Sequence, residues 1–298
     1  MSRGLMFHHI SGPGHPAVQG SVSLDDFQRI LDKHWPTLCN AQNFLSAHVI
    51  NGLDPEDEVL TFDDGLSSQW LAEPILRERG LTAFWFVPTA PLIGVASRLE
   101  IWRWIRTQCF PTMEAFYDAF WATLPADIPR YAPAGYLRDH TYLSSQDRAF
   151  RRARDHGLTA LDYERAMERV EQMQWAREVP IPTRAESLRD RWLSEGQLRT
   201  LWSQGHVIGM HSHSHPTTLA TLTHEAQEVE YMTATWILEA LYDRPTAMSH
   251  PCNEYSAHGL QYLTRLGYVL GFRATPLVAE WGPLEVPRVD SADLVKAL

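Results

Sequence analysis

The chain has 298 residues, of which 44% are hydrophobic and 11% aromatic. It is therefore globular, and long enough to bury a large core as one α/β domain or as two. A formal net charge of -10 disfavours nucleic acid and anionic membrane surfaces as main partners, because the average field repels both.

The cysteines and the N-terminal residues bear on the cellular compartment. The three cysteines, at positions 39, 109 and 252, are too far apart for a zinc knuckle or a disulfide framework. Residues 1–10 lack the apolar region of a signal peptide, and no stretch approaches the roughly 20 apolar residues of a membrane span. These patterns predict a reduced, cytoplasmic protein without a transmembrane segment.

Strands and helices are predicted to alternate over the first hundred residues. Residues 5–8 have the pattern of a strand, and residues 24–34 have that of a helix opened by Ser23. Residues 58–62 and 81–87 are further apolar strands, separated by a helix that ends near Gly80. Such alternation is typical of a parallel sheet or a barrel.

Residues 99–191 are predicted to form a helical insertion, because this stretch is charged and aromatic and contains no convincing strand. Tyr163, Met167 and Val170 recur at helical spacing on one face. The aromatic residues either fill a helical core or line a lid that shapes substrate choice; they are Trp102, Trp104, Phe116, Tyr117 and Trp121.

Alternation resumes after the insertion. Strands are expected at residues 206–210, 247–248 and 267–272, and residues 286–290 lie near the end of the chain. Between the first two of these strands, a helix carries four apolar residues on one face: Val229, Met232, Trp236 and Ala240. We therefore expect a single domain over residues 1–298, with an α/β fold that forms a distorted or incomplete (β/α) barrel.

Two short motifs follow predicted strands and carry groups that bind metals. Asp63 and Asp64 come directly after the strand at residues 58–62, and His211 follows the strand ending at Met210, four residues before His215. In α/β folds, functional groups collect just past the carboxyl ends of parallel strands. Together, the carboxylates and imidazoles predict a divalent-metal site. The alternatives are turn or capping roles for the aspartates and a solvated loop for the histidines.

Residues 61–65 (TFDDG), taken together with residues 211–216 (HSHSHP), resemble the core motifs of the polysaccharide deacetylases of carbohydrate esterase family 4. The resemblance extends to residues 80–83, 205–209 and 267–268, and covers most of the chain outside the insertion. Further segments are similar to a subgroup associated with bacterial O-antigen and surface-polysaccharide biosynthesis: residues 7–9, 19–23, 82–87 and Gln69.

The resemblance implies a division of labour among these residues. Asp64, His211 and His215 would bind the metal, Zn²⁺ or another divalent ion such as Co²⁺, Ni²⁺ or Mn²⁺. Asp63 would be the general base. The loop that contains Cys252 and Asn253 would stabilise the oxyanion through a backbone N–H, while His213 would not be a ligand.

The sequence departs from the family pattern at two positions. The arginine that orients the base is missing before Pro251, and Arg288 is the candidate substitute, with Arg273 second; either could instead be a surface charge. The C-terminal histidine that would serve as general acid is also missing. His8 is the leading candidate for this role, followed by His9 and His250, each of which could instead be structural; a reprotonated Asp63 is a further possibility.

The expected activity is metal-dependent hydrolysis of the N-acetyl group of an N-acetylated sugar. The substrate would be a surface-polysaccharide precursor of the O-antigen or capsule type, linked to a nucleotide or a lipid. Two alternatives stay open. One is a deformylase or small-molecule amidase on the same fold, and the other is a non-catalytic sugar-binding relative.

Overall fold

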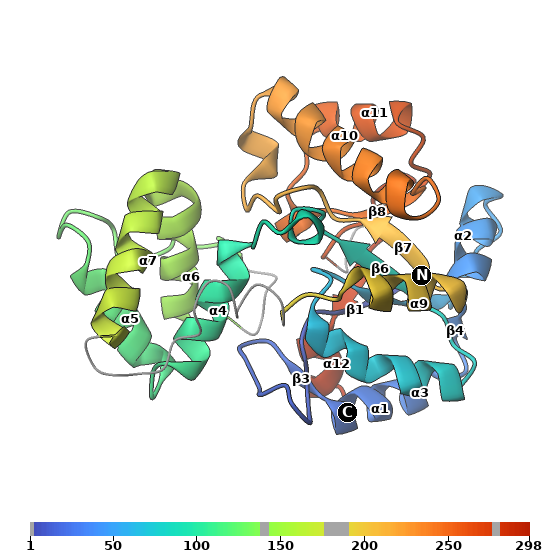
Figure 1. The fold of residues 1–298 in the computed structure, drawn as a ribbon, viewed down its shortest axis with the longest axis horizontal. Coiled ribbons are helices and arrows are strands. Elements are labelled where there is room, and N and C mark those ends of the chain that lie inside the picture. Colours follow the sequence, from blue (N-terminus) through green and yellow to red (C-terminus); the bar gives the residue numbers. More distant parts are fainter. Residues whose placement is uncertain (1–2, 138–142, 176–190, 276–280) are drawn as a thin grey trace. The chain divides into compact units, whose positions relative to one another are not determined.

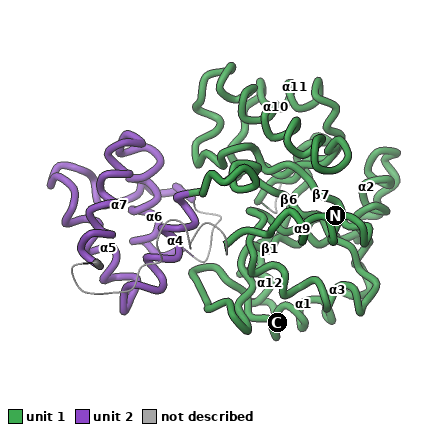
Figure 2. The backbone as a smooth tube through the Cα atoms, in the orientation of Figure 1, with its two compact units in different colours: residues 1–97, 188–298 green, residues 98–187 purple. Residues whose placement is uncertain are grey.

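A computed structural model describes residues 3–137, 143–175, 191–275 and 281–298. The chain divides into two compact units (Figure 2). Unit 1 combines Met1–Ser97 with Leu188–Leu298, and unit 2 is Arg98–Ser187. All residues predicted for the metal site and its chemistry lie in unit 1.

Unit 1 is built on an eight-stranded sheet in which every pairing is parallel. The order is β10-β1-β5-β6-β7-β8-β9, with β4 also paired to β5. The strands are β1 Arg3–Phe7, β4 Leu38–Cys39, β5 Glu58–Phe62, β6 Phe84–Val87, β7 Val207–Met210, β8 Ala247–Ser249, β9 Leu270–Phe272 and β10 Arg288–Asp290. A separate parallel pair, β2 Ile10–Ser11 and β3 Val22–Ser23, follows β1 in the chain.

The sheet curls into a nearly closed barrel, because the segment before β10 also pairs with β9. The N–H of Val286 donates to the carbonyl of Gly271 at 2.8 Å, and the N–H of Gly4 donates to the carbonyl of Pro287 at 2.9 Å. A Cβ at Gly271 would lie 2.5 Å from the backbone of Leu284, so only glycine fits this close approach. The prediction of a distorted (β/α) barrel is confirmed.

Helices surround the barrel of unit 1. Figure 1 shows α10 and α11 on one side of the sheet, and α1, α3 and α12 on the opposite side. Helix α1 spans the predicted residues, and its N-cap Ser23 accepts a hydrogen bond from the N–H of Asp26 at 3.0 Å. The helices are α1 Leu24–His34, α2 Ala41–Val49, α3 Glu73–Glu78, α9 Glu195–Ser203, α10 His224–Leu241, α11 Ala257–Arg265 and α12 Ser291–Lys296.

Aromatic side chains from the strands fill the barrel interior. Phe84, Phe86 and Phe272 pack there with Phe44 of α2. The N–H of Ala41, at the start of α2, donates to the Thr82 hydroxyl just before β6 at 3.0 Å. Helix α2 therefore covers the end of the barrel opposite the carboxyl ends of the strands.

Unit 2 is helical, and no strand occurs in its described parts, residues 98–137 and 143–175. Its main helices are α4 Arg98–Gln108, α5 Met113–Ala122, α6 Ser145–Arg152 and α7 Ala160–Trp175. Tyr163, Met167 and Val170, the predicted apolar stripe, are buried. They pack against four aromatic residues of α4 and α5, which are Trp102, Phe116, Tyr117 and Trp121. These aromatic residues therefore belong to a hydrophobic core within unit 2. Across the described residues of both units, the helices are too short or too polar to span a bilayer.

Candidate active site

The two aspartates lie just past the carboxyl end of β5. All five residues of β5 are buried, as expected for a parallel strand covered on both faces. The N–H of Asp63 donates to the carbonyl of Phe7 at 3.0 Å, so the ladder continues one residue beyond the strand. Asp64 then takes a left-handed conformation with φ 72°, and Gly65 follows with φ 58°. The reversal turns the two neighbouring carboxylates in different directions.

The histidine loop leaves β7 in the same way. The N–H of His211 donates to the carbonyl of Val87, the last residue of β6, at 3.2 Å. Ser212 has φ 58°, and its hydroxyl accepts from the N–H of His215 at 3.1 Å. This bond closes the tight loop that brings the second imidazole back beside the first, with ring centroids 4.8 Å apart.

Glu230 of α10 braces the outer side of the loop. Its carboxylate accepts from the backbone N–H of His213 at 3.0 Å, from the backbone N–H of Ser214 at 2.8 Å, and from the Ser214 hydroxyl at 2.6 Å. The His213 ring pairs with the hydroxyl of Thr89 at 2.8 Å. His213 therefore stabilises the loop through its contact with Thr89.

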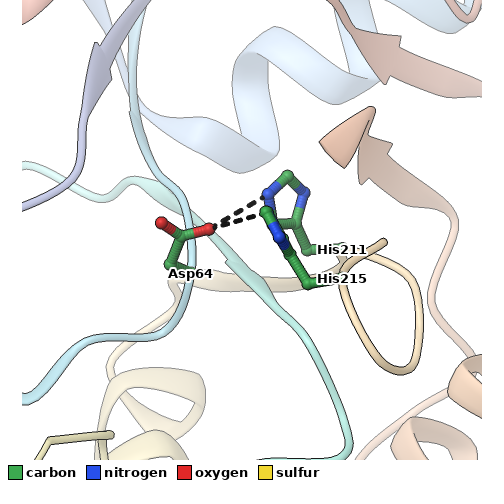
Figure 3. Close-up of side chains that lie close together, drawn as sticks. All are labelled: Asp64, His211 and His215. Carbon is green, nitrogen blue, oxygen red and sulfur yellow. Dashed lines mark ion pairs between the residues drawn. The ribbon is translucent and has the colours of Figure 1, made fainter. Parts of the chain in front are cut away.

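Asp64, His211 and His215 meet as a group that could hold a metal ion (Figure 3). Asp64 Oδ1 lies 3.3 Å from His211 Nε2 and 3.1 Å from His215 Nε2. Ligands about 2.0–2.1 Å from Zn²⁺ at tetrahedral angles are about 3.3 Å from one another. The spacing and the two-imidazole, one-carboxylate donor set therefore fit Zn²⁺ or a similar divalent ion.

The tautomer of His211 follows from its partners. Nδ1 lies 2.9 Å from the carbonyl of Ser249, which can only accept, so the proton of the neutral ring is on Nδ1. Nε2 then presents its lone pair to Asp64. This arrangement, with one ring nitrogen bonded to a backbone carbonyl and the other facing the ligand group, is usual for metal-binding histidines.

Arg288 of β10 holds the other aspartate. Its Nη1 and Nη2 each donate to one oxygen of Asp63 at 2.7 Å, which makes a bidentate ion pair. Its Nε donates to the carbonyl of Arg273 at 3.1 Å, and the side chain is 0% exposed. Because Gly4 has no side chain, Arg288 can pass beside β1: a Cβ there would lie 2.8 Å from Arg288 Cγ.

The electrostatics of the two carboxylates differ. Burial favours the neutral form of Asp63, but the charge of Arg288 outweighs it and lowers its pKa. Burial also opposes ionisation of Asp64, but the imidazole of His215 holds its pKa well below the ordinary value. Asp63 is thus an ionised carboxylate neutralised by a guanidinium, and Asp64 is an ionised carboxylate that faces two imidazoles.

The candidate acids occupy different surroundings. His8 directly follows β1 and is only partly buried. His250 is buried and its Nε2 lies 2.8 Å from the carbonyl of Leu284. Burial lowers the pKa of His250 to about 3, so its ring is neutral near pH 7 and poorly suited to donate a proton. His9 is only partly buried, and its carbonyl accepts from the N–H of Val22.

The loop with Cys252 and Asn253 follows β8 and is conformationally unusual. Both residues have positive φ, 52° and 61°. Asn253 stabilises the loop from within, because its N–H donates to the carbonyl of His250 at 3.1 Å and its Oδ1 accepts from the N–H of Ala274 at 2.8 Å. The Cys252 side chain is exposed. Arg273, the second candidate for the orienting arginine, donates from Nε to the hydroxyl of Thr275.

Two polar residues of the site were not predicted to belong to it. Ser249, which is 0% exposed, donates its hydroxyl to Asp63 Oδ1 at 3.1 Å and accepts from His211 Nδ1 at 2.7 Å, so it links the two motifs. Gln69 donates from Nε2 to the carbonyls of His8 and Asp63 and so joins β1 to β5. Gln69 was noted only for its resemblance to the O-antigen subgroup, and only the position of Ser249 just after a predicted strand could have drawn attention to that serine.

Known proteins resemble this chain in part of its sequence and in its fold. The family model of polysaccharide deacetylases matches residues 174–271, which include the histidine motif. A search of curated proteins finds no significant match.

Several solved structures have a similar fold. One is a Streptococcus pyogenes deacetylase, PplD, in complex with acetate, at 16% identity and a TM-score of 0.56, covering 99% of this chain and 96% of that one. IcaB from Ammonifex degensii has 15% identity and a TM-score of 0.58 over 99% and 95% of the two chains. A de-N-acetylase from Aggregatibacter actinomycetemcomitans has 11% identity and a TM-score of 0.57 over 99% and 98%. The chain therefore has the fold of the polysaccharide deacetylases, and its residues 174–271 match that family.

Proposed function

We propose that the protein is a metal-dependent N-deacetylase that releases acetate from an N-acetylated sugar. One observation carries the proposal: a metal-binding trio, Asp64, His211 and His215, adjoins a second carboxylate, Asp63, that Arg288 holds in place. The match of residues 174–271 to polysaccharide deacetylases supports the same activity.

The chain's own residues have separable roles in this proposal. Asp64, His211 and His215 would hold a divalent ion, which polarises the amide carbonyl and acidifies water when bound. Asp63 accepts the proton of the attacking water, since it is ionised and its orientation is fixed by Arg288.

Two further groups complete the proposed reaction. A backbone N–H of the loop at Cys252 and Asn253 stabilises the negative charge that develops on the carbonyl oxygen. His8 protonates the leaving amine, an assignment supported by its position at the end of β1, next to the strand that carries Asp63 and Asp64. The products are acetate and a sugar with a free amine.

The finer proposal is that the sugar is a nucleotide- or lipid-linked precursor of a surface polysaccharide. It is supported by the resemblance of residues 7–9, 19–23, 82–87 and Gln69 to the O-antigen subgroup. Free, nucleotide-linked and lipid-linked N-acetylated sugars should be compared as substrates at equal concentration. Higher kcat/KM for the linked sugars is the expected result, and equal values for all three classes would contradict the finer proposal.

The test of the main proposal separates the two aspartates. Protein loaded with Zn²⁺ should release acetate from at least one member of a panel of N-acetylated sugars. Asp63→Asn should abolish release and keep the metal, whereas Asp64→Asn should lose the metal. Asp32→Asn is the matched control, because Asp32 forms only an exposed ion pair with Arg79.

Each other outcome identifies a different protein. Release of formate in place of acetate would indicate a deformylase. Binding of a sugar without release of any acid, by protein that carries its full complement of metal, would indicate a sugar-binding module. Loss of metal from Asp63→Asn would show that the roles of the two aspartates are reversed.

A further inference from the structure

Unit 1 contains a cavity of about 810 Å³, and no residue assigned to the proposed reaction lines it. Its walls come from three parts of the chain: residues 48–53 at the end of α2, residues 260–269 of α11 and the turn after it, and residues 281–285 before β10. Sites for small molecules typically have volumes of about 300–1,000 Å³. The cavity is therefore large enough to hold a small ligand.

Trp281 provides a fixed aromatic wall of this cavity. Its side chain is partly buried and packs against the aromatic cluster inside the barrel, which includes Phe44 and Phe272. Tyr268 adds a second ring, and its hydroxyl forms a hydrogen bond with Thr235 at 2.8 Å. Because the protein already holds both rings, a ligand that packs on them immobilises little further side-chain freedom. Such surfaces favour a ligand with an apolar face.

Three hydrogen-bonding side chains line the same cavity. Asn51 and Gln261 are exposed, and neither side-chain amide forms a hydrogen bond within the described part of the chain. Each amide offers N–H donors and a carbonyl acceptor. The carboxylate of Glu285 accepts from the Tyr255 hydroxyl at 2.9 Å and from the N–H of Gly282 at 3.3 Å, so it is held in place with lone pairs to spare. The cavity can therefore both donate hydrogen bonds to a ligand and accept them.

The charge of the lining limits the class of ligand. The described lining residues include no lysine or arginine. Burial lowers the pKa of His48, so this ring is neutral near pH 7. The carboxylate of Glu285 repels anions, and nothing in the described lining compensates for it. Phosphates, nucleotides and fatty acids are therefore disfavoured as ligands.

We propose that this cavity is a binding site for a neutral saccharide, separate from the metal site. The C–H face of a pyranose ring packs on Trp281, and its hydroxyl groups exchange hydrogen bonds with Asn51, Gln261 and Glu285. A sugar ring combines an apolar face with a rim of hydroxyl groups, which matches a largely apolar cavity with a few polar groups. The site is independent of the proposed deacetylase activity, because no residue of that reaction lines it.

Calorimetric titration of the whole protein with tetrasaccharides of glucose, mannose, galactose and N-acetylglucosamine tests the proposal. At least one of them should bind in a saturable way. Trp281→Ala should weaken that binding about tenfold or more, since aromatic anchors contribute much of the affinity of a site. Trp236→Ala is the matched control, because Trp236 is 60% exposed on α10 and does not line the cavity. Binding by none of the four sugars, or equal binding by wild type and Trp281→Ala, would overturn the proposal.

A second variant guards against a folding defect in Trp281→Ala. Gln261 is exposed on α11, and alanine favours a helix, so Gln261→Ala should keep the Tm of the wild type. It should raise the Kd for the same sugar about threefold or more, because a hydrogen bond is lost. Gln42→Ala, at an exposed position of α2 that does not line the cavity, should leave the Kd unchanged. Equal Kd values for all three proteins would contradict the placement of the sugar. Binding of tetramethylammonium or decanoate that depends on Trp281, without binding of any sugar, would show that the ligand belongs to another class.

The result is separable from the fate of the deacetylase proposal. Binding of the sugar that depends on Trp281 should be the same in Asp64→Asn as in the wild type, whether or not acetate is released. Loss of that binding in Asp64→Asn would place the sugar at the metal site and overturn the proposal of a separate one. Intact binding without any release of acetate would refute the deacetylase proposal alone.

Discussion

Gly4→Ala should disturb the base of the proposed reaction without altering any group that takes part in it. Gly4 lies on β1, paired with Arg288 of β10. A Cβ at Gly4 would lie 2.8 Å from Cγ and 3.0 Å from Cδ of Arg288, and 3.2 Å from the Thr61 methyl group. The substitution therefore acts on the arginine stem.

The magnitude follows from these contacts. Carbon atoms in contact are roughly 3.5–4.0 Å apart, so the arginine must shift by roughly 0.5–1 Å. Both hydrogen bonds from Arg288 to Asp63 are 2.7 Å long, so a shift of this size would lengthen or break them. Overpacking typically destabilises by about 1–3 kcal/mol. Misplacement of a positioned group by about 1 Å lowers turnover about 100-fold.

Two assays on the same variant separate the effects on stability and on turnover. Urea unfolding should show the loss of stability, and acetate release from metal-loaded protein should show the loss of kcat. Gly259→Ala is the matched control, because its Cβ would lie 3.1 Å from the Tyr231 hydroxyl, away from the site. Full turnover in Gly4→Ala, with a loss of stability like that of the control, would refute the positioning role of Arg288.

Three further predictions concern polar side chains that support the site or the barrel. Ser249→Ala should lower kcat for acetate release about 10-fold or more, since a hydrogen bond to a charged group contributes about 1.5–3 kcal/mol. Ser249→Thr keeps the hydroxyl and should restore kcat. Equal kcat in both variants would contradict a role for the hydrogen bond to Asp63. Glu230→Gln should weaken Zn²⁺ binding about 10-fold in a calorimetric titration, because an amide NH2 group replaces one of the two oxygens that accept hydrogen bonds from the histidine loop. An unchanged Kd would show that Glu230 does not stabilise the loop for metal binding. Burial opposes ionisation of Glu58, but hydrogen bonds from His34, Thr37 and Arg3 lower its pKa from 4.5 to about 2. The stability that these bonds contribute is therefore present above pH 4.5 and lost as the pH falls toward 2. The difference in unfolding free energy between the wild type and Glu58→Gln should therefore shrink over that range, and a constant difference would contradict the assignment.

The positions of the three candidate metal ligands could be predicted because they depend on local patterns. A buried strand followed by two aspartates, and another followed by histidines four residues apart, placed the groups of Asp64, His211 and His215 at one end of a parallel sheet. The pairing of the strands then brings these side chains together, because β5, β6 and β7 are consecutive neighbours in the sheet.

Residues whose roles depend on contacts between distant parts of the sequence could not be predicted as firmly. Arg288 was one of two candidate arginines, and only the closure of the barrel brings its stem past Gly4 to Asp63. Ser249 has no pattern that distinguishes it from any other buried serine. Trp281 lines a cavity whose walls come from three separate parts of the chain.

Helical periodicity predicted an apolar face of α10 but could not tell which face of the helix is buried. The predicted stripe of α10 includes Val229 and Trp236, which are 54% and 60% exposed. The face that packs on the barrel instead contains Tyr231 and Leu238. Both faces of this helix carry apolar residues, so spacing alone could not tell which one is buried.

The closure of the barrel by residues 283–290 links folding to activity. Arg288 and Asp63 are separated by 225 positions in the chain, and the pairing of β10 with β1 spans almost its whole length. Contacts at such separations lose much chain entropy when they form, and they are slow to appear during folding. After dilution from denaturant, acetate release should therefore recover later than helical circular dichroism. The rate at which acetate release returns would report the last step of barrel assembly.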